Sequence, residues 1–273
     1  MTAIVDSMGQ KFYTGLIPPE TGFVSAHMPL EKSITLLTDD EIQALLADPS
    51  RTPDDQIFPD YFIARGDQKQ HNSCAGWGGA NAFSETAYLN GDRLPDNSGE
   101  VYSGSYPYSG CNRGRDAGAM LEDVLGWIQN KGMVPASVCD SENIWRQNTI
   151  RFDAQALKNR GIALHTIKSQ AEMNTALARR QIVVCVINVD RSSRYVNYRG
   201  QGLVPEFGGS GNHCIRCRDI RWNAAARRYE YKQAGNWGLG WGQRGTGWCT
   251  WASFSQTINN HTFYTLTFTA RFS

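Results

Sequence analysis

The sequence has no long apolar run and no excess of charge of either sign. Lysine and arginine number 27 against 26 aspartates and glutamates, so the formal net charge is +1, and charged residues make up 19% of the 273 residues. Such a chain offers no electrostatic basis for binding nucleic acid or an anionic membrane surface, and we expect neither partner. No stretch approaches the ~18 apolar residues that a membrane span needs.

A signal peptide is also lacking at the start of the sequence. The first ten residues, MTAIVDSMGQ, have neither a basic segment nor an apolar core. We therefore expect a soluble protein without a signal peptide. The seven cysteines fit either one free thiol plus pairs or seven reduced thiols. The missing signal favours reduced thiols, because disulfides persist mainly in oxidising compartments.

The chain divides by composition near residue 57. Residues 1–56 contain five prolines and one helix signal, the capping box from Thr38 to Glu41. Proline favours extended chain, so we expect residues 1–56 to form an N-terminal extended arm with one short helix. Residues 57–273 then form one domain, a size that can bury its own core.

Within this domain, helix signals come before most strand signals. Helical spacing of apolar residues is found at residues 74–88, 117–130 and 170–180. Strand signals follow at residues 182–187, 213–221, 228–233, 247–251 and 263–268. This order predicts an α+β fold with a helical lobe and a mainly antiparallel sheet lobe.

Cys74 stands in the first turn of a predicted helix, behind a possible cap at Asn72 or Ser73. A helix N-terminus stabilises negative charge, so it should lower the thiol pKa and favour the thiolate. The sequence thus predicts a nucleophile, with an ordinary buried thiol as the alternative. Gly76 and Gly78 in the same helix indicate close approach by another part of the chain.

The segment from Gln68 to Ser84 resembles the cysteine signature of the papain-like cysteine peptidase family, in which a glutamine lies six positions before the nucleophile. The resemblance implies a papain-like two-lobe fold and an oxyanion hole made by the Gln68 amide and the Cys74 backbone N–H. Gln70 is a competing candidate. Family members commonly carry Cys-Gly-Ser-Cys-Trp here, whereas this chain has Cys74-Ala-Gly-Trp77, so we expect a divergent member.

A histidine lies in the motif Gly-Asn-His213-Cys-Ile-Arg-Cys, at the start of a predicted strand and 139 residues after Cys74. The papain pattern places its histidine ~130–150 residues after the cysteine. The resemblance implies that His213 takes the thiol proton and later protonates the leaving amine. The alternative is a histidine hydrogen-bonded in the core.

The stretch Asn236-Trp237-Gly-Leu-Gly-Trp241-Gly resembles the family's Asn-Ser-Trp-Gly segment. Its tryptophans and glycines are in register, but the asparagine is one residue late. Either Asn236 orients the imidazole, with Trp237 shielding that hydrogen bond, or the third member of a triad is missing.

Further similarity extends over roughly residues 57–255. The loop that ends at Gly114 resembles the family's Gly-Cys-x-Gly-Gly loop, which implies that Gly114 lines the substrate cleft. By the same resemblance, Trp77 and Trp237 are expected at the substrate-binding site. The implied function is a cysteine peptidase that cleaves peptide bonds in a protein or peptide substrate.

Two other hypotheses remain open. Cys214 and Cys217 suggest a zinc site, but alternation along a strand puts them on opposite faces, so we expect no metal and no cofactor. A papain-like scaffold without activity is also possible, because fold alone does not establish function. In that case the arm would dock onto an assembly partner, as in a virion, and the protein would be virion-associated instead of cytoplasmic.

Overall fold

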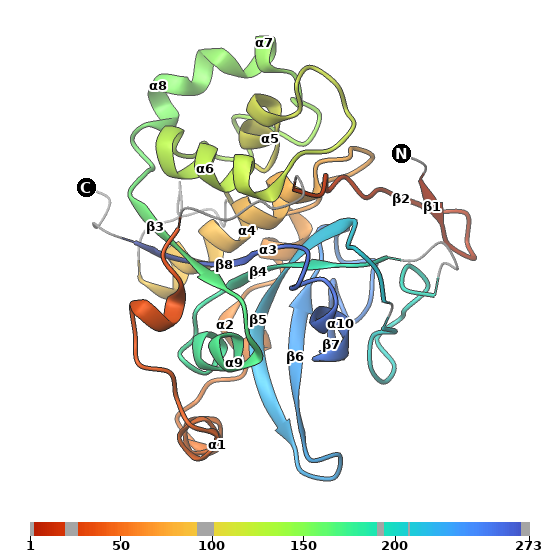
Figure 1. Cartoon of the computed structure of the whole chain (residues 1–273). Helices are drawn as coiled ribbons and strands as arrows, with labels where there is room; N and C mark the ends of the chain where they lie inside the picture. The colour runs from red at the N-terminus through yellow and green to blue at the C-terminus, as the bar shows by residue number, and fades with distance from the viewer. Residues whose placement is uncertain (1–2, 20–26, 92–100, 190–193, 207, 269–273) are drawn as a thin grey trace.

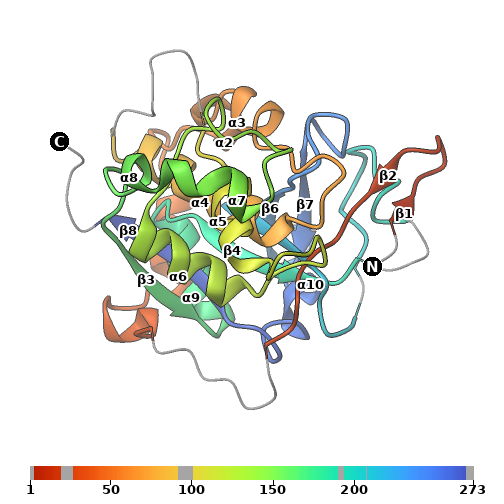
Figure 2. The same ribbon diagram turned by 90° about the horizontal axis from the view of Figure 1, so that it is seen from above.

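The computed structural model describes residues 3–19, 27–91, 101–189, 194–206 and 208–268. Helices α5 (Ser105–Cys111), α6 (Leu121–Lys131), α7 (Arg146–Thr149) and α8 (Asp153–Ala156) lie at one end of the molecule. The long strands β5 (His213–Asn223) and β6 (Arg228–Ala234) extend towards the other end (Figure 1). In the view from above, helices α5 to α8 lie in front of the sheet (Figure 2).

The N-terminal arm contains more regular structure than the sequence predicts. Strands β1 (Ile4–Val5) and β2 (Lys11–Phe12) pair antiparallel. They are followed by η1 (Leu30–Lys32), α1 (Asp39–Ala47) and α2 (Asp54–Ile57). The predicted capping box is confirmed at α1, where Glu41 N–H donates to Thr38 Oγ1 at 3.3 Å and Thr38 N–H donates to Glu41 Oε2 at 2.8 Å. The expectation of one short helix is therefore too simple.

Helix α4 (Cys74–Leu89) is the central element of the helical lobe and is buried from Cys74 to Ala87. Its glycines permit close packing: a Cβ on Gly76 would lie 2.2 Å from the Gly104 carbonyl oxygen, and one on Gly78 would lie 2.6 Å from Cys214 Sγ. The lobe also contains α3 (Tyr61–Ala64), α5 (Ser105–Cys111), α6 (Leu121–Lys131), α7 (Arg146–Thr149), η2 (Ile150–Phe152) and α8 (Asp153–Ala156).

Within the described residues, a six-stranded antiparallel sheet has the order β3-β8-β4-β5-β6-β7. The strands are β3 (Ile162–Ile167), β4 (Val183–Ile187), β5 (His213–Asn223), β6 (Arg228–Ala234), β7 (Thr246–Thr250) and β8 (Phe263–Phe268). Helices α9 (Gln170–Ala178) and α10 (Ala252–Ser255) pack against the strands. Strand β5 also contacts α4. The start of β5 lies at the start of α4, because the Cys214 N–H donates to Cys74 Sγ at 3.5 Å.

The predicted α+β fold is confirmed, and β4 to β8 lie within two residues of the predicted strands. The helix expected over residues 117–130 begins only at Leu121. Gly118 has a φ of 102°, outside the helical region, and the Ala119 N–H bonds to Gly15 of the arm. Among the described helices, none is long and apolar enough to cross a membrane.

Candidate active site

The sulfur of Cys74 lies at the N-terminus of α4 and is fully buried. It accepts hydrogen bonds from the backbone N–H of Gly15, at 3.2 Å, and of Cys214, at 3.5 Å. Ser73 is the N-cap residue, but its side chain makes no cap hydrogen bond. The contact with Cys214 brings the helix start next to the residue that follows His213.

The imidazole of His213 is fully buried at the start of β5. It stacks on the Trp237 indole, with ring centroids 4.4 Å apart and an interplanar angle of 22°. Within the part of the chain that the structure describes, neither ring nitrogen has a hydrogen-bond partner. The β5 backbone directly after His213 thus lies against the Cys74 sulfur, and the Trp237 indole packs on the imidazole.

Burial controls the protonation of both groups. It raises the pKa of the Cys74 thiol to about 11, although backbone N–H donors act in the opposite direction. It lowers the pKa of His213 to about 3. The expectation of a lowered thiol pKa is therefore wrong for this covered state, because loss of hydration outweighs the helix N-terminus. The pair is a neutral thiol and a neutral imidazole here.

The N-terminal arm covers the sulfur. Leu16, the residue after Gly15, is buried. Its N–H donates at 3.3 Å to the carbonyl oxygen of Asn212, the residue before His213. The arm therefore presents a backbone N–H to Cys74 Sγ and covers the thiol, which is fully buried.

The arm also pairs with the loop before α6. Ala119 N–H donates to the Gly15 carbonyl oxygen at 2.9 Å, and Ile17 N–H donates to the Ala119 carbonyl oxygen at 3.0 Å. A side chain does not fit at position 15, because a Cβ on Gly15 would lie 1.7 Å from the Asn72 carbonyl oxygen. Sequence reasoning found neither Gly15 nor Ala119, since no local pattern marks a residue that is selected by a distant contact.

Gln68 is fully buried, and its side-chain amide is a hydrogen-bond donor. Its Nε2 donates to the carbonyl oxygens of Tyr13, at 3.1 Å, and His71, at 2.7 Å. Trp237 Nε1 donates to the same Tyr13 oxygen at 3.1 Å. The competing candidate, Gln70, instead lines a groove of about 720 Å³ between the arm and Trp237.

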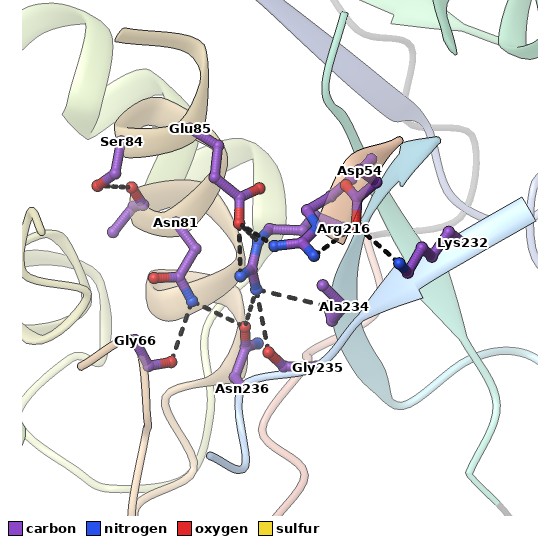
Figure 3. Close-up of polar contacts among 12 residues, drawn as sticks. Asp54, Gly66, Asn81, Ser84, Glu85, Arg216, Lys232, Ala234, Gly235 and Asn236 are labelled. Carbon is purple, nitrogen blue, oxygen red and sulfur yellow. Dashed lines mark hydrogen bonds and ion pairs between the residues drawn. The ribbon is translucent and has the colours of Figure 1, made fainter. Parts of the chain in front are cut away.

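Asn236 does not bond to the imidazole. Its Nδ2 donates to the carbonyl oxygens of Cys74, at 3.2 Å, and Cys214, at 2.9 Å. Its Oδ1 accepts from Asn81 Nδ2 at 3.1 Å and from Arg216 at 3.3 Å (Figure 3). These contacts connect α4, β5 and the turn after β6, in place of the predicted orientation of His213. Asn236 stands one residue later than the asparagine of the family segment, and its amide bonds to backbone carbonyl oxygens.

Of the predicted cleft residues, Trp77 lies in the core and Gly114 lies in an exposed loop. Trp77 is 1% exposed and packs against Gly104, so its predicted role in substrate binding is corrected to a role in the core. Gly114 has a φ of 74°, and its N–H donates to Asn112 Oδ1 at 2.9 Å. The backbone hydrogen bonds described between this region and the arm are made by Ala119.

His71, in the loop before α4, lies between two carboxylate side chains. Its Nδ1 lies 3.2 Å from Asp116 Oδ2, and its Nε2 lies 3.0 Å from Glu142 Oε2. The hydrogen bond to Asp116, followed by that to Glu142, raises the pKa of His71 against the opposing effect of burial. The sequence offered no motif that would have placed this histidine.

All seven cysteines are free thiols. Cys214 and Cys217 contact different elements: Cys214 Sγ faces Gly78 of α4, whereas Cys217 interacts with Cys185 of β4. Over the described ranges, no three histidine, cysteine, aspartate or glutamate side chains are grouped to hold a metal ion.

No family model matches the sequence, and no curated protein matches it. Solved structures do share its fold. Xylellain, a cysteine protease from Xylella fastidiosa, has a TM-score of 0.68 at 14% identity, with 99% of each chain covered. Procathepsin B S9 from Trypanosoma congolense has a TM-score of 0.61 at 14% identity, covering 96% of this chain and 91% of that one.

Procathepsin L 3 from the larval midgut of Tenebrio molitor has a TM-score of 0.61 at 16% identity. The match covers 74% of this chain and 66% of that structure, so this chain spans about two thirds of its length. At such identities the similarity shows the fold alone. The chain has the α+β fold of the papain-like cysteine proteases.

Proposed function

We propose that the protein is a papain-type cysteine peptidase in which Cys74 is the nucleophile and His213 the general base and acid. The observation that carries this proposal is the contact between the start of α4 and the start of β5. The Cys74 thiol at a helix N-terminus touches the N–H of Cys214, directly after a buried histidine that stacks on Trp237. The fold shared with cysteine proteases supports the same assignment.

In the proposed reaction, the arm first leaves Cys74. Water then reaches the thiol and the imidazole, and the burial that holds both groups neutral is relieved. The thiol proton passes to His213, and the N-terminus of α4 stabilises the resulting thiolate. The covered state is therefore an inhibited form of the site.

The thiolate then attacks the carbonyl carbon of the scissile peptide bond. The oxygen that becomes negative accepts hydrogen bonds from the Cys74 N–H, at the start of the helix, and from Gln68 Nε2. The contact of Gln68 Nε2 with the Tyr13 carbonyl oxygen supports this role, since it already binds a carbonyl oxygen there. The imidazolium protonates the leaving amine as the C–N bond breaks, which leaves the acyl group on Cys74 as a thioester. Water activated by His213 then hydrolyses this thioester.

We also propose that residues 1–56 are a regulatory arm and residues 57–273 the peptidase domain. The last part of the arm is tied to β5 by two ion pairs. Arg51 lies 2.7 Å from Asp219, and Asp54, which is buried, lies 2.7 Å from Arg218. We therefore expect opening to involve residues 11–17 while residues 51–54 stay bound.

A catalytically inactive scaffold is the second candidate. The observation in its favour is that Asn236 forms hydrogen bonds with Asn81, Arg216 and two backbone carbonyl oxygens, and none with the imidazole. The ring nitrogens of His213 have no hydrogen-bond partner among the described residues. The structures named above are cysteine proteases or their proforms, so they lend no support to a role in a virion.

Cleavage mapping tests the two candidates. Wild-type protein, Cys74→Ser and the arm variant Gly15→Ala would be incubated with a peptide library, and new termini would be identified by mass spectrometry. A peptidase gives cleavages with Gly15→Ala that disappear when Cys74→Ser is added to it. If Gly15→Ala exposes the thiol to alkylation and still cleaves nothing, the scaffold is the better account.

A further inference from the structure

A network of buried charged side chains lies between α4 and β5, next to the turn after β6 (Figure 3). Arg216 of β5 and Glu85 of α4 are both fully buried. Arg216 Nε donates to Glu85 Oε1 at 2.7 Å, and its second terminal nitrogen, Nη2, lies 2.7 Å from the same oxygen. Buried charges are costly unless paired, so this pair is held in a defined geometry.

The remaining terminal nitrogen of Arg216 reaches the turn after β6. Its Nη1 lies 3.4 Å from the Ala234 carbonyl oxygen, 3.0 Å from that of Gly235 and 3.3 Å from Asn236 Oδ1. One guanidinium therefore holds helix α4 through Glu85 and the turn through Asn236.

This turn contacts both proposed catalytic residues. Asn236 Nδ2 donates to the carbonyl oxygen of Cys74 itself and to that of Cys214, next to His213. Trp237, the next residue, carries the indole on which the imidazole stacks. Displacement of the turn would therefore change the position of the thiol relative to the imidazole.

We infer that Arg216, held by Glu85, is a positioning residue for the Cys74–His213 pair. It touches neither the thiol nor the imidazole and acts through Asn236 and Trp237. The inference rests on the proposed function for its catalytic meaning, but the positioning itself is a structural property. Lysine at this position would keep the charge and lose the planar fork that reaches two elements at once.

Arg218 provides a matched control two residues along β5. It also pairs with Glu85, at 3.3 Å, and with Asp54, at 2.7 Å, and it is 4% exposed. No hydrogen bond described for Arg218 reaches residues 234–237. Arg218→Lys thus disturbs the same buried network without a direct effect on the turn.

Histidine NMR gives a readout that does not need turnover. The chain has five histidines, so the imidazole carbon–proton spectrum is simple to assign. Stacking on an indole displaces the His213 signals through the ring current. We expect Arg216→Lys to move these signals towards those of an unstacked imidazole, and Arg218→Lys to leave them at the wild-type position.

Kinetics on a cleaved peptide provide the second readout. Arg216→Lys should lower kcat about tenfold with KM within about twofold, whereas Arg218→Lys should change either constant less than about twofold. If Arg216→Lys does not fold, Glu85→Leu with Arg216→Met replaces it, because an apolar pair often substitutes for a buried ion pair. The same displacement of the His213 signals is expected.

An unmoved His213 signal in the Arg216 variants, or an equal displacement in Arg218→Lys, overturns the inference. A Gly15→Ala protein that is open to alkylation and has no turnover would count against the proposed peptidase, while the NMR comparison would still decide whether Arg216 positions the pair.

Discussion

Replacement of Gly15 by alanine should uncover the Cys74 thiol. A Cβ at this position would lie 1.7 Å from the carbonyl oxygen of Asn72 and 2.1 Å from its carbonyl carbon. These are backbone atoms of the loop before α4, so they cannot move aside as a flexible side chain would. Gly15 is not among the residues with positive φ, so the clash, and not backbone strain, is the cause.

The size of the effect follows from the contacts that the arm would lose. Four backbone N–H bonds hold residues 15–17: one to Cys74 Sγ, two exchanged with Ala119 and one to Asn212. At ~0.5–1.5 kcal/mol net for each bond, their loss amounts to ~2–6 kcal/mol. The ratio of open to covered molecules should then rise by a factor between about 30 and about 25,000.

Alkylation of Cys74 measures this ratio directly. Wild-type protein and Gly15→Ala would be treated briefly with iodoacetamide, and labelled peptides would be counted by mass spectrometry. Met8→Ala is the matched control, because Met8 belongs to the same arm and is 72% exposed. We expect labelling of Cys74 to be at least tenfold faster in Gly15→Ala and unchanged in Met8→Ala. Equal rates in a folded Gly15→Ala protein would refute the proposed covering by the arm.

Three further predictions concern the site. Cys74→Ser and His213→Ala should each abolish peptide cleavage in the Gly15→Ala background, because they remove the nucleophile and its base. The thermal unfolding midpoint should stay within a few degrees of that of Gly15→Ala. Full turnover in either variant would contradict the assignment. Acid should open the arm: burial lowers the pKa of His213 from 6.5 to about 3, so the covered state loses about 1.4 kcal/mol for each pH unit below 6.5. Cys74 should then react faster at pH 5 than at pH 7 with a pyridyl disulfide reagent, which stays reactive in acid, and a slower reaction would speak against this coupling. His71→Gln should reduce stability mainly in acid, because the raised pKa of His71 means that its contribution is fully present below pH 6.5 and is lost as pH rises through the raised value. Unfolding midpoints that differ from wild type equally at pH 5.5 and pH 9 would show that charge plays no part.

The helices and strands that position the site were largely predictable from the sequence. Apolar spacing and β-branched runs are local properties, and they predicted β4 to β8 within two residues. The spacing of Cys74 and His213 also predicted the candidate pair, since a resemblance in motif order carries information about tertiary contacts. The short strand β3, from Ile162 to Ile167, was not predicted.

Tertiary structure alone decided the chemical state of the pair and the contacts of Asn236. The helix N-terminus at Cys74 predicted a lowered thiol pKa, but burial beneath Gly15 raises this pKa. The reason is that the hydration of a charged thiolate depends on every segment packed around it. Asn236 lies one residue from its expected place, and its amide bonds to two backbone carbonyl oxygens instead of the imidazole. Local patterns determine which residues form a helix or strand. The distant segment that covers a thiol, or that accepts an amide proton, depends on how the whole chain packs.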